Sequence, residues 1–311
     1  MNRLSAPLLA FVLWAVGCAH DLPGWKVAST DHFRLHTDRP RRSFDSVLER
    51  LEDVHAGLAS SFFSEVKVPP MEVFLFETGE FEDLLGDKTG GLFVGGGPGS
   101  RGILVLPEAF EAEYLERTAA HELAHGFVNA TFQNVPIWFN EGFASYCESI
   151  KIFDDKVWFG SSNVFAAGSA VRGQLVPVRE LFSARAERFH GDLGERHYTT
   201  AWAVIHYIWH GEQKSLRGRF DQFGATLAAN GKVPDASAKV WQTIFNDVPF
   251  SNVDDRLRDH INAVFALPKS SLVGFRMNRP KAPSIKLTPA DMKYVDEVRA
   301  GLRTIRLGRN S

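Results

Sequence analysis

The sequence predicts an α+β fold, in which a mixed β-sheet with helices comes first and a mainly helical part follows. Short apolar strand patterns separated by turn residues dominate residues 25–106, whereas apolar residues recur at helical spacing over most of residues 107–268. The 311-residue chain is 44% hydrophobic and 23% charged. This composition is typical of a folded protein that buries a sizeable core.

The first part is expected to hold five strands and two helices. Ser43 starts the longer helix, in which apolar residues recur three and four positions apart up to Phe62, and a short helix is expected over residues 80–85. The strands are bounded by turn residues. They are expected over residues 25–30, 32–37 and 71–76, and on either side of the glycine-rich turn within residues 90–106.

The second part is predicted to be helical almost throughout. Pro107 can start one long helix and Pro136 precedes another, because proline is favoured in the first turn of a helix. A β-hairpin is expected around residues 152–159. Further helices are expected over residues 166–172, 198–209, 216–229, 236–245 and 253–265.

Residues 269–311 differ from the rest of the chain in charge. They carry ten Lys and Arg against three Asp and Glu, whereas residues 19–268 carry 24 against 34. Thr288, followed by Pro289, is expected to cap a helix that runs to about Thr304. We therefore expect a basic tail with one helix that packs on the body, in preference to a dedicated contact with an anionic surface.

Residues 1–18 have the organisation of a secretory signal, with a positive start at Asn2-Arg3 and an apolar run over residues 8–16. The last four residues, Ala-Val-Gly-Cys, resemble a bacterial lipobox. This resemblance implies that Cys18 carries a lipid and anchors the mature chain to a membrane; a cleaved signal without a lipid is the alternative. Because Ala19, and not Asp, follows the cysteine, an outer-membrane lipoprotein facing the periplasm or the cell surface is expected.

Charge and cysteine count exclude several classes of protein. The formal net charge of -2 and the pI near 6.6 give no electrostatic basis for nucleic-acid binding. Cys18 and Cys147 are the two cysteines, so a disulfide-stapled scaffold and a cysteine-rich zinc finger are excluded. Any metal site must therefore use His and carboxylate side chains, and Cys147 is expected to be a small buried hydrophobic residue.

Residues 121–125 form the pattern H-E-x-x-H, here His-Glu-Leu-Ala-His. Residues four apart project from the same face of a helix, so the side chains of His121 and His125 can reach one metal ion. A second string, W-F-N-E-G-F-A-S-Y, follows at residues 138–146 and opens another helix. The first helix is supported by an apolar stripe opposite its histidines, formed by Leu115, Ala119, Leu123, Phe127 and Ala130.

Together these two strings resemble the gluzincin clan of zinc metallopeptidases, and the second is similar to its counterpart in the M1 aminopeptidases. The length and layout of the chain are closer to the compact peptidase MA-like proteins of bacteria. The resemblance implies a metallopeptidase domain over residues 19–268 that acts on a peptide or protein substrate. It also implies Zn²⁺ held by His121, His125 and Glu141, with the fourth position left to water.

The chain departs from these families at three points. The spacer before Glu141 is shorter than in M1 enzymes, and no G-x-M-E-N-like segment precedes His121 to bind a free amino terminus. In thermolysin-like members, an acidic residue one turn after the third ligand orients a ligand histidine, whereas Ser145 occupies that position here. The detailed resemblance covers residues 118–148.

Two residues are predicted to act in catalysis. Zinc makes water nucleophilic near pH 7, and Glu122 lies beside the two histidines, where it can take the proton of that water as general base. Gluzincins also need a donor for the oxyanion that develops on the substrate. Tyr198, at a helix start, is the candidate, with a packing role as the alternative; His197 is held in reserve and is interpreted as an exposed residue near the helix cap.

Three further features are interpreted without a catalytic role. His206 and His210 lie four residues apart without a third acidic motif, so packing histidines are expected there. Gly95–Gly99 is expected to be a hairpin turn and not a phosphate loop. The preceding segment, residues 91–94, is the expected edge strand on which gluzincins bind an extended peptide.

Two alternatives to a peptidase stay open at this point. One is a zinc-stabilised binding or assembly lipoprotein of the cell envelope without catalysis. The other is a zinc amidase that acts on peptidoglycan.

Overall fold

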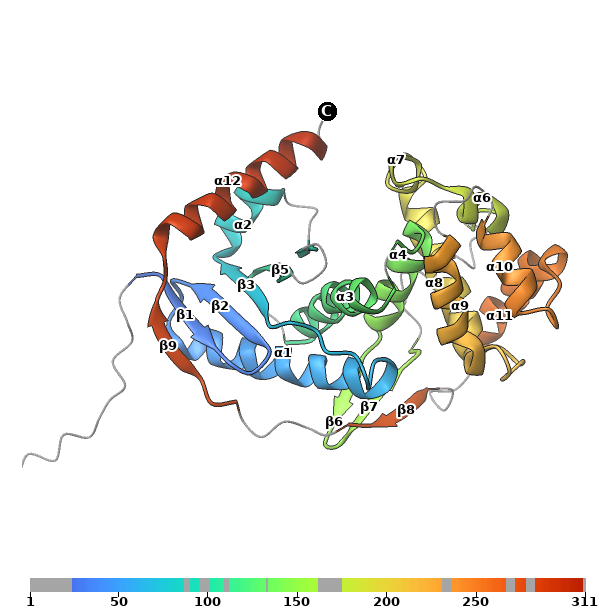
Figure 1. Cartoon of the computed structure of the whole chain (residues 1–311), viewed down its shortest axis with the longest axis horizontal. Helices are drawn as coiled ribbons and strands as arrows, with labels where there is room; N and C mark the ends of the chain where they lie inside the picture. Colours follow the sequence, from blue (N-terminus) through green and yellow to red (C-terminus); the bar gives the residue numbers. More distant parts are fainter. Residues whose placement is uncertain are drawn as a thin grey trace, which may run out of the picture.

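The computed structural model describes residues 24–86, 90–95, 101–108, 112–132, 134–161, 175–230, 236–266, 272–277 and 283–309. Its architecture is mixed α+β, with a six-stranded sheet in the N-terminal half and helices in the C-terminal half, as the sequence predicted (Figure 1). The expected signal, Cys18, the helix at residues 166–172 and most of the turn Gly95–Gly99 lie outside the described residues.

The main sheet contains the five predicted strands and a sixth from the C-terminal tail. In spatial order the strands are β4 (Leu92–Val94), β5 (Ile103–Pro107), β3 (Met71–Phe76), β2 (Phe33–Thr37), β1 (Lys26–Ser29) and β9 (Lys286–Pro289). The pairs β2–β3 and β3–β5 are parallel, and the outer pairs are antiparallel. Helix α1 (Arg41–Phe62) makes the crossover that a parallel β2–β3 pair requires.

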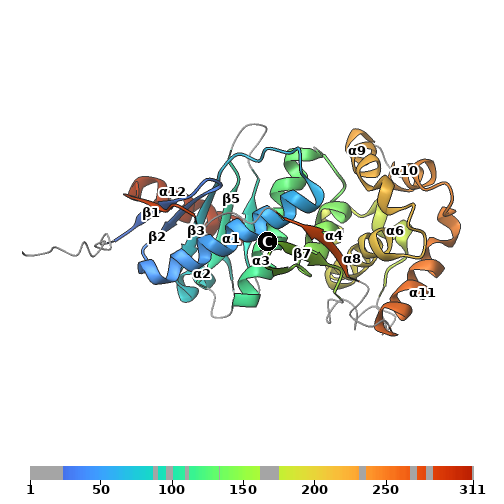
Figure 2. The same cartoon turned by 90° about the horizontal axis from the view of Figure 1, so that it is seen from below.

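Helices cover both faces of the sheet. Along β3, Val73 and Leu75 belong to the large core under α1 and α3 (Ala112–Thr131), while Phe74 and Phe76 belong to a second core under α2 (Thr78–Leu85) and α12 (Met292–Arg309). Figure 1 shows the sheet between these helix pairs, and Figure 2 shows α1 crossing in front of the strands. Because helices cover both faces of the sheet, every residue of β3 is buried. Burial on both faces explains why the residues of this strand are almost all apolar.

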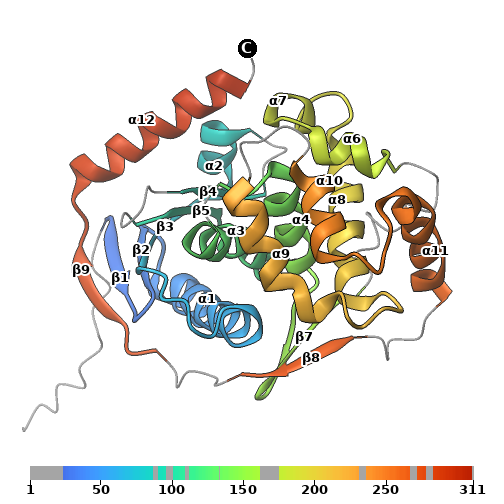
Figure 3. The ribbon, with the colours of Figure 1, turned by 45° about the vertical axis from the view of Figure 1, so that its right-hand side comes forward.

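The basic tail is built into both sheets of the protein. β8 (Val273–Arg276) pairs with β7 (Lys156–Phe159), which forms the predicted hairpin with β6 (Lys151–Phe153), and β9 then pairs with β1. Figure 3 shows β8 and β9 on the outer side of the molecule, with α12 following β9. The sequence predicted the helix but not these two strands.

The start of α12 differs from the prediction. Thr288 and Pro289 lie in β9, and the helix begins at Met292. The capping side chain is Asp291, whose Oδ1 accepts a hydrogen bond of 3.0 Å from the Lys293 amide. Pairing with β1 holds Thr288 in an extended conformation, so the next residue with a suitable oxygen caps the helix.

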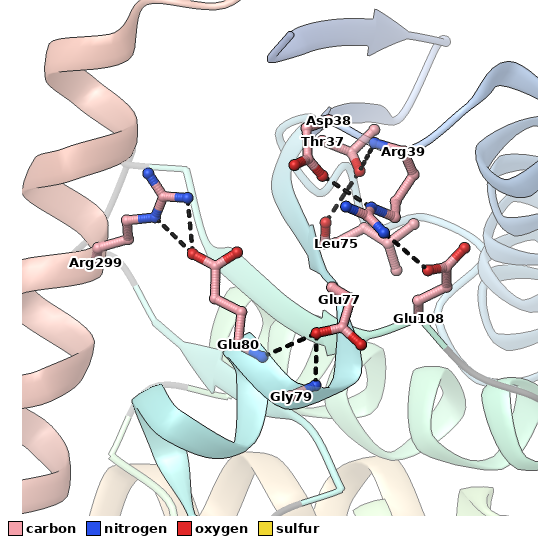
Figure 4. Close-up of polar contacts among 9 residues, drawn as sticks. All are labelled: Thr37, Asp38, Arg39, Leu75, Glu77, Gly79, Glu80, Glu108 and Arg299. Carbon is pink, nitrogen blue, oxygen red and sulfur yellow. Dashed lines mark hydrogen bonds and ion pairs between the residues drawn. The ribbon is translucent and has the colours of Figure 1, made fainter.

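Opposite charges join the tail to the body (Figure 4). Arg299 of α12 places Nη2 2.7 Å and Nε 2.8 Å from Oε1 of Glu80 on α2. The guanidinium also lies 4.8 Å from the centre of the Trp25 ring. Glu77 caps the start of α2 by accepting from the amides of Gly79 and Glu80, at 2.9 and 3.2 Å. Part of the surplus positive charge of the tail therefore pairs with an acidic helix of the same chain.

The second half is helical, with two short α-helices that the sequence analysis did not predict, at residues 178–183 and 186–189. Helix α3 begins at Ala112, because Pro107 is the last residue of β5 and does not start the helix. No described helix is both long and apolar enough to cross a membrane. The remaining helices are α4 (Ile137–Cys147), α6 (Val178–Ser183), α7 (Ala186–Phe189), α8 (Gly194–His210), α9 (Phe220–Asn230), α10 (Ala236–Ile244) and α11 (Val253–Ala266).

Candidate metal centre

Helix α3 carries the first two candidate ligands. Leu115, Ala119, Leu123 and Phe127 are buried in the main core, as predicted, whereas Ala130 near the helix end is exposed. This anchoring turns the face with His121 and His125 toward α4. Their ring centres lie 4.9 Å apart with the planes nearly perpendicular.

Helix α4 brings the third candidate ligand to this face. It begins directly after Pro136, as predicted, and its buried Trp138 donates from Nε1 to the Ser237 hydroxyl at 3.0 Å. Gly142 lies against α8, where a Cβ would stand 2.7 Å from the carbonyl oxygen of Ala201. Glycine at this position therefore allows α4 and α8 to approach closely, and Glu141 is directed toward α3.

The three predicted ligands converge. Nε2 of His121 and Nε2 of His125 each lie 3.7 Å from Oε2 of Glu141, and the three ligand atoms lie within 4.8 Å of one another. A distance of 3.7 Å is too long for a hydrogen bond but close to the separation of about 3.4 Å between ligands of a tetrahedral zinc ion. Within the described part of the chain, no other group of three His, Cys, Asp or Glu side chains converges in this way.

The charges around the centre suit a cation. Burial raises the pKa of Glu141, but its contact with His121 and the positive charges of nearby histidines lower that pKa to about 2, so the carboxylate is ionised at neutral pH. Burial lowers the pKa of His121, and the carboxylates of Glu141 and Glu148 overcome this effect and raise it well above its ordinary value. A metal ion must therefore displace a proton from His121 to bind.

Glu148 orients His121, a role that the sequence analysis did not assign. Its Oε1 lies 2.8 Å from Nδ1 of His121, and its Oε2 accepts a hydrogen bond of 3.2 Å from Arg117. Bonding at Nδ1 leaves Nε2 free to bind a metal. Ser145, which stands where thermolysin-like members carry the acidic partner, is buried. Glu148 stands seven residues after Glu141, two helical turns on the same face, which is the signal that could have identified it.

His125 has Asn140 as a polar neighbour beside the centre. Burial lowers the pKa of His125, as does the charge of His121, while Asn140 raises it. Nδ1 of His125 and Oδ1 of Asn140 are both buried, and neither has a hydrogen-bond partner of good geometry among the described residues.

Glu122 lies between α3 and the edge strand β4. Its side chain is 9% exposed. A Cβ on Gly91, directly before β4, would stand 3.3 Å from Cγ of Glu122 and 2.7 Å from Cγ2 of Thr118. Among the described strands, β4 pairs only with β5, so it is an edge strand next to the predicted base, as the sequence analysis expected.

Tyr198 belongs to a cluster with His190, which the sequence analysis missed. The Tyr198 hydroxyl lies 3.2 Å from Nδ1 of His190, and the positive charge of His190 contributes to the low pKa of Glu141. His190 follows a short unpredicted helix, and a single histidine in such a segment gives no sequence signal.

His197 does not match its predicted environment. It is completely buried, and its ring stacks on Phe189 with centres 5.5 Å apart, whereas an exposed position near the cap was expected. The reason is that α8 begins at Gly194, so His197 lies within the helix and faces α7. Burial lowers its pKa.

His206 and His210 are packing histidines, as predicted. Nδ1 of His206 lies 2.9 Å from Nε2 of His260, and Nε2 of His206 lies 3.3 Å from the carbonyl oxygen of Gly160. Nε2 of His210 bonds to the hydroxyl of Tyr146 at 2.9 Å. Cys147 is fully buried, as expected.

Comparison with known proteins adds no family to this description. No protein-family model matches the chain, and no curated protein matches it.

Proposed function

We propose that the protein is a zinc-dependent metallopeptidase, with Glu122 as general base. The observation that carries the proposal is the convergence of two imidazole nitrogens and a carboxylate oxygen on one point beside Glu122. Two histidines and one glutamate are the ligand set of open, catalytic zinc sites, whereas structural zinc sites have four protein ligands.

His121, His125 and Glu141 would hold the zinc ion. When bound, zinc would polarise a substrate carbonyl and lower the pKa of water to about 7. Glu148 and Arg117 support this use of the residues, because a hydrogen-bonded chain fixes the ring of His121 with Nε2 toward the other ligands. A histidine held in this way loses little freedom when it binds a metal.

Glu122 would move the proton in hydrolysis. Its carboxylate takes a proton from the water whose oxygen adds to the scissile carbonyl carbon. It then gives that proton to the amine nitrogen as the carbon–nitrogen bond breaks. The nearly complete burial of Glu122 beside the ligands supports this role, since a base must lie within hydrogen-bond reach of the attacking water.

The position of β4 favours a peptide as the substrate. An edge strand offers unpaired main-chain N–H and C=O groups to an extended segment of another chain. Gly91 brings this strand into contact with Glu122, so a peptide paired with β4 would pass beside the base. This arrangement supports a peptidase more directly than either alternative, a silent binding lipoprotein or a peptidoglycan amidase.

We further propose that the enzyme acts in the cell envelope. The signal-like residues 1–18 and the lipobox-like sequence that ends at Cys18 support export and a lipid anchor. Mass spectrometry of the protein from a bacterial membrane fraction tests this proposal. A diacylglyceryl group on Cys18 is expected, and a mature chain that begins elsewhere without a lipid would contradict it.

The decisive experiment combines zinc analysis with hydrolysis of an unstructured protein. Glu122→Gln is expected to retain one equivalent of zinc while turnover falls about 10²- to 10⁴-fold. Glu113→Gln is the matched control, because Glu113 lies on the same helix, is exposed and pairs only with Lys151 among the described residues. Unchanged turnover in the Glu122 variant would refute the assigned base. Zinc binding without cleavage would favour a binding protein, and cleavage of muropeptides alone would favour the amidase.

A further inference from the structure

Tyr114 lies on the same face of α3 as two of the candidate ligands. It precedes His121 by seven residues, and seven steps of about 100° bring a helix back to within about 20° of the same direction. His125 continues this line one turn further on. The distance along the helix axis from Tyr114 to His121 is about 10 Å, or about two turns. The tyrosine is therefore in line with the candidate metal centre, toward the beginning of the helix.

The side chain of Tyr114 is exposed, unlike the other large apolar side chains of this helix. Tyr114 is 46% exposed. The main core buries the others, which are Leu115, Leu123, Phe127 and Val128. The charged side chains nearest to it along the helix form ion pairs, Glu113 with Lys151 and Arg117 with Glu148. Helix α3 therefore presents an uncharged aromatic ring to solvent on its ligand face.

The edge strand β4 follows α3 from Tyr114 past the proposed base. A Cβ on Gly90, before the strand, would stand 2.8 Å from the Tyr114 hydroxyl oxygen. After the strand, a Cβ on Gly95 would stand 3.1 Å from Nδ2 of Asn129. Between these points, the residue directly before β4 lies beside the proposed base. The contacts advance together along both elements, so β4 and α3 run in the same direction, with Tyr114 at the beginning of the strand.

An extended peptide paired with β4 would pass along this face of α3. An extended chain advances about 3.3 Å per residue, so the separation of about 10 Å between His121 and Tyr114 corresponds to about three residues. Antiparallel pairing is the more stable arrangement, and it places the C-terminal part of the peptide at the beginning of β4. The third or fourth residue after the cleaved bond would therefore reach the ring of Tyr114.

We propose that Tyr114 is a specificity-determining residue, whose ring packs against an apolar side chain at the third or fourth position after the cleaved bond. The inference rests on the proposed function, because it requires a peptide that crosses the metal centre. It extends that function by naming the substrate class, peptides with an aromatic or large aliphatic residue at this distance. An exposed ring suits such a residue, since aromatic side chains offer a large apolar surface and favour contact with another ring.

Two synthetic peptides with an N-terminal hydroxamate test the inference by binding. The hydroxamate chelates zinc and so fixes the register of the residues that follow it. Phenylalanine occupies the third and fourth positions in one peptide, and alanine occupies the first four positions in the other. Calorimetry on the zinc-loaded protein should show about three- to tenfold tighter binding of the phenylalanine peptide. Equal binding would overturn the inference, and binding of neither peptide would overturn the proposed metal centre with it.

The preference should depend on the ring of Tyr114. Tyr114→Ala should bind the two peptides with Kd values within about twofold of each other, whereas Tyr114→Phe, which keeps the ring, should retain the preference. Glu113→Ala is the matched control at the neighbouring position and should also retain it. An undiminished preference in Tyr114→Ala would overturn the inference. An equal loss in Tyr114→Phe would also overturn it, because the hydroxyl beside Gly90 would then be responsible.

Cleavage is measured separately, so that failure of this inference can be distinguished from failure of the proposed function. A preference that depends on Tyr114 without cleavage of any peptide would support the inference and refute hydrolysis alone. If an unstructured protein is cleaved, mass spectrometry of the products should show apolar residues enriched at the third or fourth position after the cleaved bonds. Cleavage without this enrichment would overturn the inference and leave the proposed function intact.

Discussion

The contact between Glu148 and His121 should contribute measurably to metal affinity. Oε1 of Glu148 lies 2.8 Å from Nδ1 of His121, and its side chain is 21% exposed. A hydrogen bond between charged groups is worth about 1.5–3 kcal/mol when it is shielded from water. Because this pair is partly solvated, we expect Glu148→Ala to weaken zinc binding by about 1.4–2 kcal/mol, or roughly 10- to 30-fold.

The pH dependence of this effect follows from the same contact. Glu148 raises the pKa of His121 and so also stabilises the proton that zinc must displace. Zinc affinity should therefore rise with pH in the native protein as that proton is lost. It should rise less steeply in the variant, in which the proton is held less tightly. The difference between the two proteins should be larger at about pH 8.5 than at about pH 6.

Competition with a chromophoric zinc chelator measures these affinities. Glu113→Ala is the matched control, since this glutamate lies on α3, the helix of His121, but is exposed and pairs with Lys151. Its zinc affinity should stay within about twofold of the native value. If Glu148→Ala binds zinc as tightly as the native protein at both pH values, the assigned role of Glu148 is refuted.

Two further predictions concern stability. Gly142→Ala should lower the free energy of unfolding by about 1–3 kcal/mol, because the added Cβ would meet the carbonyl oxygen of Ala201. Gly301→Ala in α12, where a Cβ meets nothing within 4 Å, should raise that free energy by up to about 1 kcal/mol. Urea denaturation of both variants checks this, and equal effects would contradict it. Burial lowers the pKa values of His55 and His260 to about 4 in the folded protein, so between about pH 6.5 and pH 4 the unfolded chain binds more protons than the folded chain. The free energy of unfolding should therefore keep its full value above this window and fall through it by at most about 3 kcal/mol per histidine. A melting temperature that is constant from pH 7 to pH 4.5 would argue against this.

The elements that local patterns specify were predicted well. The strand at residues 71–76 has the predicted bounds, and α3 has its apolar stripe in the core as far as Phe127. The spacing of His121 and His125 sets their common face, because a helix repeats every 3.6 residues whatever surrounds it. These features depend on residues only a few positions apart, so a sequence window contains the information that determines them.

Features that depend on distant partners were not predicted. β8 and β9 are four residues each, and they are strands because β7 and β1 offer open edges to them. Glu148 came to lie beside His121 in the same way, through the packing of α4 against α3. The spacing from Glu141 places Glu148 on the same helical face, but no local pattern shows that this face meets His121.

The sequence by itself determined the α+β order and the identity of the candidate ligands. The periodicity that forms each helix also decides which side chains share its face. Only the tertiary structure decided that Glu141 meets both histidines, that Glu148 orients His121, and that the basic tail completes the sheets. The physical reason is that these contacts join separate elements, and their geometry depends on how whole faces pack, which no local spacing specifies.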